Sequence, residues 1–344
     1  MKNRTSVLVA MSGGVDSTTT AYTLQKQGYD VVGCYMKLHN NEKKHTKNIR
    51  MVQKAADFLN IDFHVLDLNK EFNETVYNPF IKAYKDGITP NPCVHCNKNI
   101  KFGALIDFAK KLNISKVATG HYIQIKNGLL YEAADKSKDQ SYFLSQIKPE
   151  VLETLIFPLG DRYKKDVKEF ALSVPELQEF STQKESSEIC FVEESYVDIL
   201  KEYVDVDMVG DVLNTKGEVV GKHKGYMHYT IGKRKGFEVH GAHDPHYVVS
   251  INPAKNEIVV GDKLDLERKE FYVTSLNLFK KMDKVFDSSV KIRYRSPKVA
   301  CKVFVDEDML GAKVVLDENI SAVTSGQIAA FYDNEYLIAG GIIL

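Results

Sequence analysis

The chain has 344 residues, of which 44% are hydrophobic and 27% are charged, and its 46 basic and 46 acidic side chains cancel at neutral pH. This composition is that of an ordinary globular protein and excludes a low-complexity or largely disordered chain. The length exceeds one compact core of typical size, so two or three domains are expected. No apolar run approaches the roughly 20 residues that cross a bilayer, and the first residues enter a strand instead of a cleavable signal. We therefore expect a cytoplasmic protein without a membrane partner.

The first predicted element is an apolar strand that ends in a glycine-rich turn, SVLVAMSGGVDS at residues 6–17. Gly13 and Gly14 allow a sharp turn whose N–H groups approach an anion, and Ser12 and Ser17 add hydroxyl donors. A helix follows, and the positive end of its dipole points to the same place. The turn is predicted to hold a pyrophosphate, although no lysine follows the glycines as in a Walker-type loop. An ordinary Gly-Gly turn is the alternative.

Strands and helices then alternate with short connections. Helices are predicted at 18–26, 46–59, 71–84, 100–112 and 164–173, and strands at 30–36, 62–68 and 116–122. This alternation is typical of a doubly wound parallel sheet, in which ligands bind at the carboxyl ends of the strands. The turn at 12–17 falls at such an end. Asn127 and Gly128 predict a hairpin over residues 123–132.

Residues 86–97 (DGITPNPCVHCN) are predicted to form a rigid, exposed loop that carries Cys93 and Cys96. Cysteines of a cytosolic chain are expected to be reduced, so a spaced pair suggests metal binding or chemistry. Three interpretations stay open: a zinc site completed by Cys190 or His121, a thioredoxin-like pair at a helix start, and a nucleophile that pairs with distant Cys190. The two remaining cysteines, Cys34 and Cys301, are expected to be buried packing residues.

Beyond about residue 205 the chain changes to short apolar segments separated by glycines, which predicts β structure. Strands are expected at 290–294, 301–305, 313–316, 327–332 and 336–343. Two segments, 222–236 and 291–302, hold basic residues without an acidic one, and we interpret them as contacts to nucleic-acid phosphates. The predicted division of the chain is 1–204, 205–266 and 267–344.

The SGGxDS turn resembles the loop of the PP-loop ATP pyrophosphatase superfamily, whose members activate an oxygen or carboxyl group by adenylation. Further motifs in chain order resemble the tRNA-specific 2-thiouridylase (MnmA) family of that superfamily. They are TPNPCVHCNKNIKF at 89–102, TGHY at 119–122, KDQSYFL at 138–144, FPLG at 157–160, ICF at 189–191, YTIGKRKG at 229–236, KIRYRS at 291–296 and SGQIAAFY at 325–332. The resemblance implies an α/β, adenine nucleotide alpha hydrolase-like domain with a helical tRNA-contacting region, followed by two small β-barrel-like domains.

The resemblance also implies an activity and its residues. The family is an ATP-dependent tRNA sulfurtransferase that makes 2-thiouridine at the wobble position. ATP contacts are implied for Ala10, Met11, Ser12, Gly13, Gly14, Val15, Asp16, Ser17, Met36 and Gly120, with Asp16 near Mg²⁺. Asn91, Pro92 and Cys93 match the segment that meets the target base, Cys96 the catalytic cysteine and Cys190 the persulfide carrier. The tRNA-contacting positions match Lys138, Asp139, Gln140, Arg293 and Tyr294.

The implied chemistry suits these residue types. Adenylation turns the 2-oxo group of uridine into part of an AMP leaving group, and a persulfide on Cys190 attacks the activated carbon. Cys96 then forms a disulfide with Cys190, or first releases the sulfur as hydrosulfide; either route needs a thiolate, for which Lys98 and Lys101 supply positive charge. The expected partners are a tRNA with a wobble uridine and a persulfide carrier or cysteine desulfurase, and the protein is expected to be a monomer.

Three alternatives stay open beside this hypothesis. Some members of the family have Asp where this chain has Cys93, so the proton acceptor is unassigned, and Cys93, Cys96 and Cys190 are possible ligands of an iron–sulfur cluster. Another adenylating enzyme of the superfamily, a small-molecule synthetase or amidotransferase, needs neither the cysteine pair nor the basic β segments. A noncatalytic RNA-binding module does not need an intact SGGVDS turn.

Overall fold

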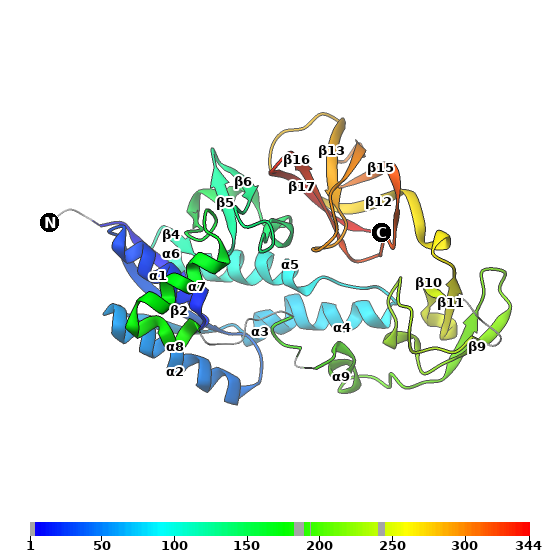
Figure 1. Ribbon diagram of the computed structural model, residues 1–344, viewed down its shortest axis with the longest axis horizontal. Helices are drawn as coiled ribbons and strands as arrows, with labels where there is room; N and C mark the ends of the chain where they lie inside the picture. The colour runs from blue at the N-terminus through cyan, green and yellow to red at the C-terminus, as the bar shows by residue number, and fades with distance from the viewer. Residues whose placement is uncertain (1–3, 182–188, 193, 240–244) are drawn as a thin grey trace. The chain divides into compact units, whose positions relative to one another are not determined.

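The computed structural model describes residues 4–181, 189–192, 194–239 and 245–344. Contacts divide the chain into two compact units. Unit 1 comprises Met1–Val76, Cys93–Ser187 and Asp333–Ile338, and unit 2 comprises Tyr77–Pro92, Glu188–Tyr332 and Ala339–Leu344. Figure 1 shows the elements in chain order. Within the described residues, no helix is long and apolar enough to cross a membrane.

Unit 1 is built on a five-stranded parallel sheet, which confirms the predicted doubly wound α/β fold. Its strands are β1 (Ser6–Ala10), β2 (Asp30–Lys37), β3 (Phe63–Asp67), β4 (Lys116–Ala118) and β7 (Leu155–Ile156), in the order β3-β2-β1-β4-β7. The chain moves outward from β1 to β3 and then returns to β4 on the other side of β1. In doubly wound sheets, ligands bind at the carboxyl end of the strands where the strand order reverses, and here this is the end of β1.

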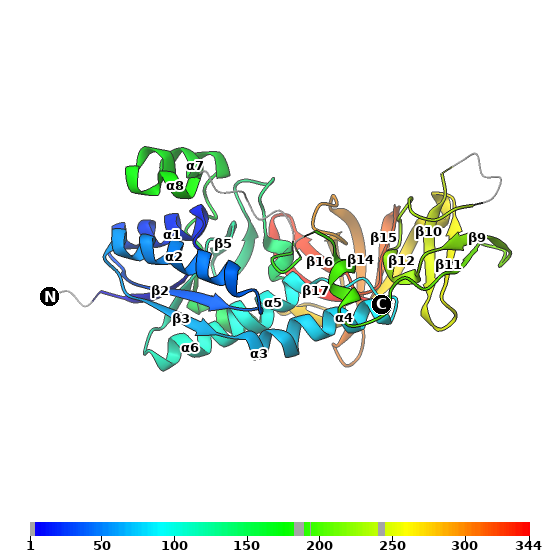
Figure 2. The same ribbon diagram turned by 90° about the horizontal axis from the view of Figure 1, so that it is seen from below.

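Helices cover both faces of this sheet (Figure 2). Helices α1 (Val15–Lys26) and α2 (Glu42–Leu59) lie on one face, and α6 (Leu105–Lys111) lies on the other. Helices α7 (Lys164–Ser173) and α8 (Gln178–Ser181) pack on α1. The core between the sheet and these helices includes fully buried Val7, Val9 and Leu24. Burying such apolar side chains contributes about 1.5–3 kcal/mol each, so this face holds β1 and its turn in place.

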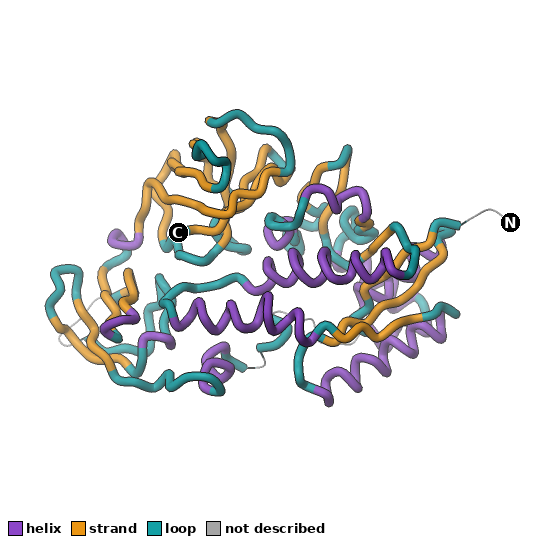
Figure 3. The backbone as a smooth tube through the Cα atoms, turned by 180° about the vertical axis from the view of Figure 1, so that it is seen from behind, coloured by secondary structure: helices purple, strands orange, loops and turns teal. Residues whose placement is uncertain are grey.

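Two helical runs continue without a break through several elements (Figure 3). One comprises α3 (Asn69–Phe72), the π-helical η1 (Asn73–Tyr77) and α4 (Asn78–Lys85), and the other comprises α5 (Pro92–Cys96), the π-helical η2 (Asn97–Ala104) and α6. The prediction of a loop through residue 97 was therefore wrong from Pro92 onward. Proline is well tolerated at the first helical position, where its missing N–H has no partner to lose.

The predicted hairpin is confirmed as β5 (Ile123–Lys126) and β6 (Leu129–Glu132). Asn127 and Gly128 have φ of 52° and 74°, as the two central residues of a type I′ turn require. Strand β6 also pairs with the start of β17 (Tyr336–Ile343), through Leu130 opposite Leu337. The predicted strand over 116–122 ends earlier, at Ala118, because the chain leaves the sheet before Gly120.

The C-terminal part of the chain, residues 267–343, forms a closed, six-stranded antiparallel barrel. Its strands are β12 (Glu267–Leu278), β13 (Val285–Lys291), β14 (Val299–Val305), β15 (Gly311–Ser321), β16 (Ile328–Asp333) and β17, in the order β12-β15-β14-β13-β16-β17. Pairing of β12 with β17 closes the ring, which removes both sheet edges. In β14, buried and exposed residues alternate without exception, as a barrel wall requires.

The central part of unit 2 is a four-stranded sheet packed on helices. Strands β8 (Gly210–Leu213), β9 (Val219–His223), β10 (Tyr247–Asn252) and β11 (Glu257–Gly261) have the order β10-β11-β8-β9. Their apolar face shares a core with Phe80 of α4 and Leu200 of α9 (Tyr196–Lys201). The short 3₁₀ helices of the chain are η3 (Ser141–Leu144), η4 (Pro149–Thr154), η5 (Pro175–Leu177), η6 (Tyr226–His228), η7 (Pro253–Lys255) and η8 (Leu264–Leu266).

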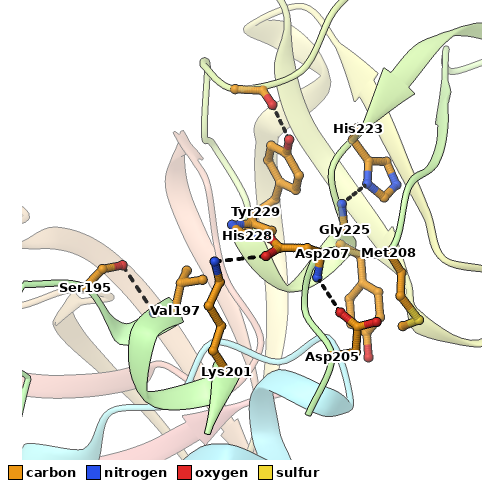
Figure 4. A network of polar contacts seen from close by, with 12 residues as sticks. Ser195, Val197, Lys201, Asp205, Asp207, Met208, His223, Gly225, His228 and Tyr229 are labelled. Atoms are coloured by element: carbon orange, nitrogen blue, oxygen red, sulfur yellow. Dashed lines mark hydrogen bonds and ion pairs between the residues drawn. The ribbon is translucent and has the colours of Figure 1, made fainter.

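Buried histidines tie this sheet to its neighbours (Figure 4). His223 is 3% exposed; its Nδ1 accepts a hydrogen bond from the Gly225 N–H (2.9 Å), and its Nε2 donates to the Asn256 carbonyl (3.1 Å). Nearby, Asp207 accepts from Nε2 of His228 at 2.7 Å and from Lys201 of α9 at 2.9 Å. A ring with one donating and one accepting nitrogen is neutral, and burial lowers the pKa of His223 below its ordinary 6.5.

Acid is therefore expected to destabilise the fold of unit 2 through His223. Below pH 6.5 the unfolded chain binds a proton at this residue while the folded ring does not. As the pH is lowered below 6.5, the free energy of unfolding therefore decreases by up to about 1.4 kcal/mol per pH unit. The decrease ends when the pH reaches the lowered pKa of the folded state. Urea unfolding from pH 7 to 5 should show a smaller loss in His223→Asn than in the wild type. Equal losses in both proteins would contradict the prediction.

Candidate nucleotide and sulfur-transfer site

The turn after β1 has the geometry of an anion site. The Ser12 N–H donates to Oγ of Ser17 (3.2 Å), and that hydroxyl donates to the Gly14 carbonyl (3.0 Å), so the turn is closed by its own serines. Gly14 is the N-cap of α1, and no side chain caps it. The first N–H groups of this twelve-residue helix therefore receive no acceptor from the N-cap residue, which is the arrangement that binds phosphate.

Two glycines let neighbouring backbone approach this turn. A Cβ atom on Gly13 would lie 2.9 Å from Cβ of Met51 and 3.0 Å from the Asn48 carbonyl oxygen, both on α2, and Gly13 has a φ of +82°. A Cβ atom on Gly120, just beyond β4, would lie 3.1 Å from Cβ of Asp16. A larger residue at Gly13 would require its surroundings to shift, and one at Gly120 would require Asp16 to move by a few tenths of an ångström. The structure thus brings Gly120, one of the residues matched to ATP binding, against the turn.

Asp16 is the acidic residue of the turn and is paired on two sides. Both of its carboxylate oxygens lie 2.6 Å from Nζ of Lys164, and the Tyr122 hydroxyl donates to one of them at 2.9 Å. The Lys164 ammonium also lies 5.6 Å from the centre of the Tyr122 ring. Lys164 was not among the expected site residues, because 148 residues separate it from Asp16 and no local pattern marks it.

Met36 lies on β2 beside the turn. It belongs to the carboxyl end of the strand, opposite Leu66 of β3, and is partly buried. The Met11 N–H, at the start of the turn, donates to the carbonyl of Cys34 two residues earlier in β2. Met36, whose backbone is matched to ATP binding, therefore lies on the strand that holds the start of the turn, at the same edge of the sheet.

Cys93 and Cys96 lie on one turn of helix, because α5 spans Pro92–Cys96. Residues three apart on a helix face the same side. Cys93 is partly buried, and Cys96 is only 6% exposed. Lys98 and Lys101, the expected sources of positive charge, lie on the helical segment that follows, η2. The cysteines thus precede two cations on a single helical run.

A buried histidine connects this helical run to the end of β4. Nδ1 of His121 lies 2.6 Å from the Thr119 hydroxyl, and Nε2 lies 3.5 Å from Nζ of Lys101. Burial, followed by the charge of Lys101, holds the pKa of His121 well below 6.5, so the ring is neutral at physiological pH. The aromatic rings of Phe102 and Phe157 flank it. This neutral ring is available as a hydrogen-bonding group but not as a charge.

Cys190 belongs to unit 2 and is exposed. The next residue, Phe191, packs edge-on against Tyr77 and Phe80, with ring centroids 5.4 and 5.3 Å apart. The Val192 N–H donates to the Ile189 carbonyl, so the short segment turns. The aromatic contacts thus fix the ICF motif on the end of η1 and on α4. Of the SSEICF stretch, residues 186–188 lie outside the described residues.

The residues matched to tRNA contacts also have roles inside the protein. Asp139 is 3% exposed and accepts hydrogen bonds from the Ala133 N–H and the Ser141 hydroxyl. Oε1 of Gln140 accepts from the Tyr122 N–H at 2.9 Å. In unit 2, Arg293 donates to the Ala322 carbonyl and the Thr324 hydroxyl. The remaining two matched residues are Lys138 and Tyr294.

Metal binding by protein side chains alone is not seen in the part of the chain that the structure describes. No three His, Cys, Asp or Glu residues among those positions lie close enough to hold an ion. A Mg²⁺ ion that travels with a nucleotide needs only one or two carboxylates, because phosphates and water supply its other ligands. Asp16, whose side chain is 34% exposed, fits this smaller requirement.

Three family models match the chain in succession. Residues 5–194 match a tRNA methyl transferase HUP domain, residues 197–262 a tRNA methyl transferase PRC-barrel domain, and residues 268–343 an aminomethyltransferase beta-barrel domain. Curated relatives match over almost their whole length. The tRNA-specific 2-thiouridylase MnmA of Campylobacter lari is 55% identical over 98% of this chain and 99% of its own, and that of Sulfurimonas denitrificans is 53% identical over 98% of each.

The chain also has a distant likeness to a solved structure. A 4-thiouridine synthetase–RNA complex with bound ATP has 16% identity and a TM-score of 0.35, and it covers 58% of this chain and 49% of that one. This likeness is too low to bear on function. The doubly wound sheet and the uncapped SGGVDS turn define an α/β protein of the PP-loop class. Within that class, the identity over nearly the full length shows that the chain belongs to the tRNA-specific 2-thiouridylase (MnmA) family.

Proposed function

We propose that this chain is an ATP-dependent tRNA sulfurtransferase, which adenylates the 2-oxo group of a wobble uridine and replaces that oxygen by sulfur. The observation that carries the proposal is that one compact unit holds both the uncapped phosphate turn and the Cys93–Cys96 helix. Adenylation requires a phosphate-binding turn, and sulfur transfer requires a reactive thiol. The relatives' names favour tRNA over the small-molecule substrate of the alternative hypothesis.

The ATP half of the reaction is assigned to the turn and its neighbours. Ala10–Ser17 would bind the pyrophosphate, the backbone at Met36 and Gly120 would bind adenosine, and Asp16 would hold Mg²⁺. When bound, the ion neutralises phosphate charge as the α-phosphorus is attacked. The uridine O2 becomes bonded to AMP, and pyrophosphate leaves. Helix N–H groups aimed at the departing charge stabilise it by about 3 kcal/mol per well-placed donor.

The sulfur half is assigned to the cysteines. The outer sulfur of a Cys190 persulfide attacks C2 of the base, and AMP leaves with the former oxygen. The Cys96 thiolate then attacks Sγ of Cys190, which forms a disulfide and releases 2-thiouridine; an external thiol must reduce that disulfide. In the second route, Cys96 first frees hydrosulfide, which attacks the base. Exposure of Cys190 suits its loading by a persulfide carrier or cysteine desulfurase.

The tRNA contacts are proposed from the family motifs. Asn91, Pro92 and Cys93 would contact the flipped base, and the segment Lys138–Gln140 with Arg293 and Tyr294 would contact the tRNA. Because Asp139 and Arg293 are committed to internal hydrogen bonds, we infer that they shape the contacting surface. The three family models support the division into 1–204, 205–266 and 267–344. We further propose that the protein acts as a monomer in the cytoplasm.

The deciding assay supplies the purified protein with ATP, Mg²⁺, a labelled persulfide donor and a tRNA that has uridine at the wobble position. Labelled sulfur should enter the tRNA only with ATP, and one AMP should form per sulfur transferred. The matched control is the same tRNA with cytidine at that position, which should stay unlabelled. ATP consumption that ignores tRNA, with no label transferred, would instead support a small-molecule adenylating enzyme.

A further inference from the structure

The phosphate turn contains no cationic side chain of its own. Residues 10–17 (AMSGGVDS) include no Lys, Arg or His, whereas a bound pyrophosphate carries several negative charges. Backbone N–H groups and a helix dipole offset part of that charge. Loops of the Walker type add a lysine from the loop itself. The proposed ATP chemistry therefore raises the question of which cation this site uses.

Lys164 brings a cation to the turn from another part of the fold. Its Nζ lies 2.6 Å from both carboxylate oxygens of Asp16, and its side chain is only 9% exposed. A nearly buried ammonium needs a fixed negative partner, because desolvation is costly. Asp16 provides this partner and is itself 34% exposed. The Lys164 ammonium is thus hydrogen-bonded directly to Asp16, a partly exposed residue of the phosphate turn.

The position of Lys164 is itself held by several contacts. It is the first residue of α7, and its backbone N–H donates to Oδ2 of Asp135 at 3.0 Å. The other oxygen of Asp135 accepts from the N–H and hydroxyl of Ser137. On its other side, the Lys164 ammonium lies over the Tyr122 ring, whose hydroxyl also donates to Asp16. Such contacts pre-organise a charge, which is what a charge-stabilising site requires.

We propose that Lys164 is the pyrophosphate-binding cation of this site. It pairs with Asp16 when the turn is empty and also contacts phosphate oxygens when ATP or pyrophosphate is bound. A lysine suits this role because its ammonium is a compact point charge with three donors. The inference rests on the proposed function for its substrate. The alternative is that the Lys164–Asp16 ion pair only holds α7 on α1, and the experiment must distinguish this structural role from phosphate binding.

The test measures binding of inorganic pyrophosphate and of AMP to the full chain by calorimetry, in buffer without metal. Lys164→Met should weaken pyrophosphate binding by about 10- to 100-fold, the usual value of a charged hydrogen bond. AMP binding should stay unchanged, because AMP lacks the β- and γ-phosphates. Lys164→Arg should recover most of the lost affinity. The matched control is Lys165→Met, the next residue of α7, whose side chain is 82% exposed and which should bind both ligands as the wild type does.

A second comparison covers the case in which Lys164→Met leaves Asp16 unpaired and does not fold. Asp16→Asn alone should bind metal-free pyrophosphate at least as tightly as the wild type, because the ammonium loses its competing partner. Asp16→Asn combined with Lys164→Met removes both charges, and it should bind pyrophosphate about 10- to 100-fold more weakly than Asp16→Asn alone. Equal pyrophosphate affinity with and without Lys164, or an equal loss for AMP, would overturn the assignment. A wild type that binds neither ATP nor pyrophosphate when Mg²⁺ is also supplied would overturn the proposed function itself.

Discussion

Serine at position 96 or 190 is expected to reduce sulfur transfer to tRNA by more than about 1,000-fold, as the loss of a nucleophile does in other enzymes. A serine hydroxyl does not carry a persulfide at Cys190, and at Cys96 it does not attack one. The hydroxyl is isosteric, so both variants should fold and still release pyrophosphate from ATP, because adenylation of the uridine precedes the cysteine chemistry. The measurement is labelled sulfur in tRNA, with pyrophosphate release followed in the same samples.

The chain offers a matched control in Cys301. Burial raises the pKa of its thiol to about 12, so it is not a thiolate at neutral pH, and Cys301→Ser should transfer sulfur normally. Cys93→Ser separates two routes: it should retain transfer if sulfur moves through a persulfide, and lose it if Cys93 is a ligand of an iron–sulfur cluster. Full transfer by both Cys96→Ser and Cys190→Ser would disprove the proposed mechanism.

Alanine at Gly13 is expected to slow AMP formation by about 100-fold, the scale of a misplacement of roughly 1 Å at a reacting group. The new Cβ atom would meet Cβ of Met51 at 2.9 Å and the Asn48 carbonyl at 3.0 Å. A φ of +82° adds about 1–2 kcal/mol of backbone strain. Because the carbonyl belongs to α2, the turn must move, and its N–H groups then no longer face the phosphates.

Gly28 provides the control for this prediction. It has a similar φ of +92°, but a Cβ atom there would meet nothing within 4 Å. Gly28→Ala should therefore cost about 1–2 kcal/mol of stability through strain alone, with AMP formation unchanged. Urea unfolding and single-turnover AMP release distinguish the two effects. If Gly13→Ala releases AMP at the rate of Gly28→Ala, then the approach of α2 to the turn is not what positions the phosphates.

Much of the fold could be predicted because its signals are local. The apolar run before Ser12, the glycines of the turn and Asn127-Gly128 each act through the backbone of a few adjacent residues. The predicted helix at 164–173 has the observed bounds of α7. The loop predicted through residue 97 failed at Pro92, because a proline breaks a helix in its interior but is well suited to its first position.

The sequence by itself determined the phosphate turn, the parallel α/β sheet and the family, because turn chemistry, strand–helix alternation and ordered motifs are readable along the chain. Only the tertiary structure decided which groups meet at that turn. Lys164 reaches Asp16 across 148 residues, and Gly120 packs against the same side chain. Such pairings depend on the order β3-β2-β1-β4-β7, which places β4 beside β1, and on the packing of α7 against α1. Strand order is settled by packing across the whole sheet, and no spacing within the sequence encodes it.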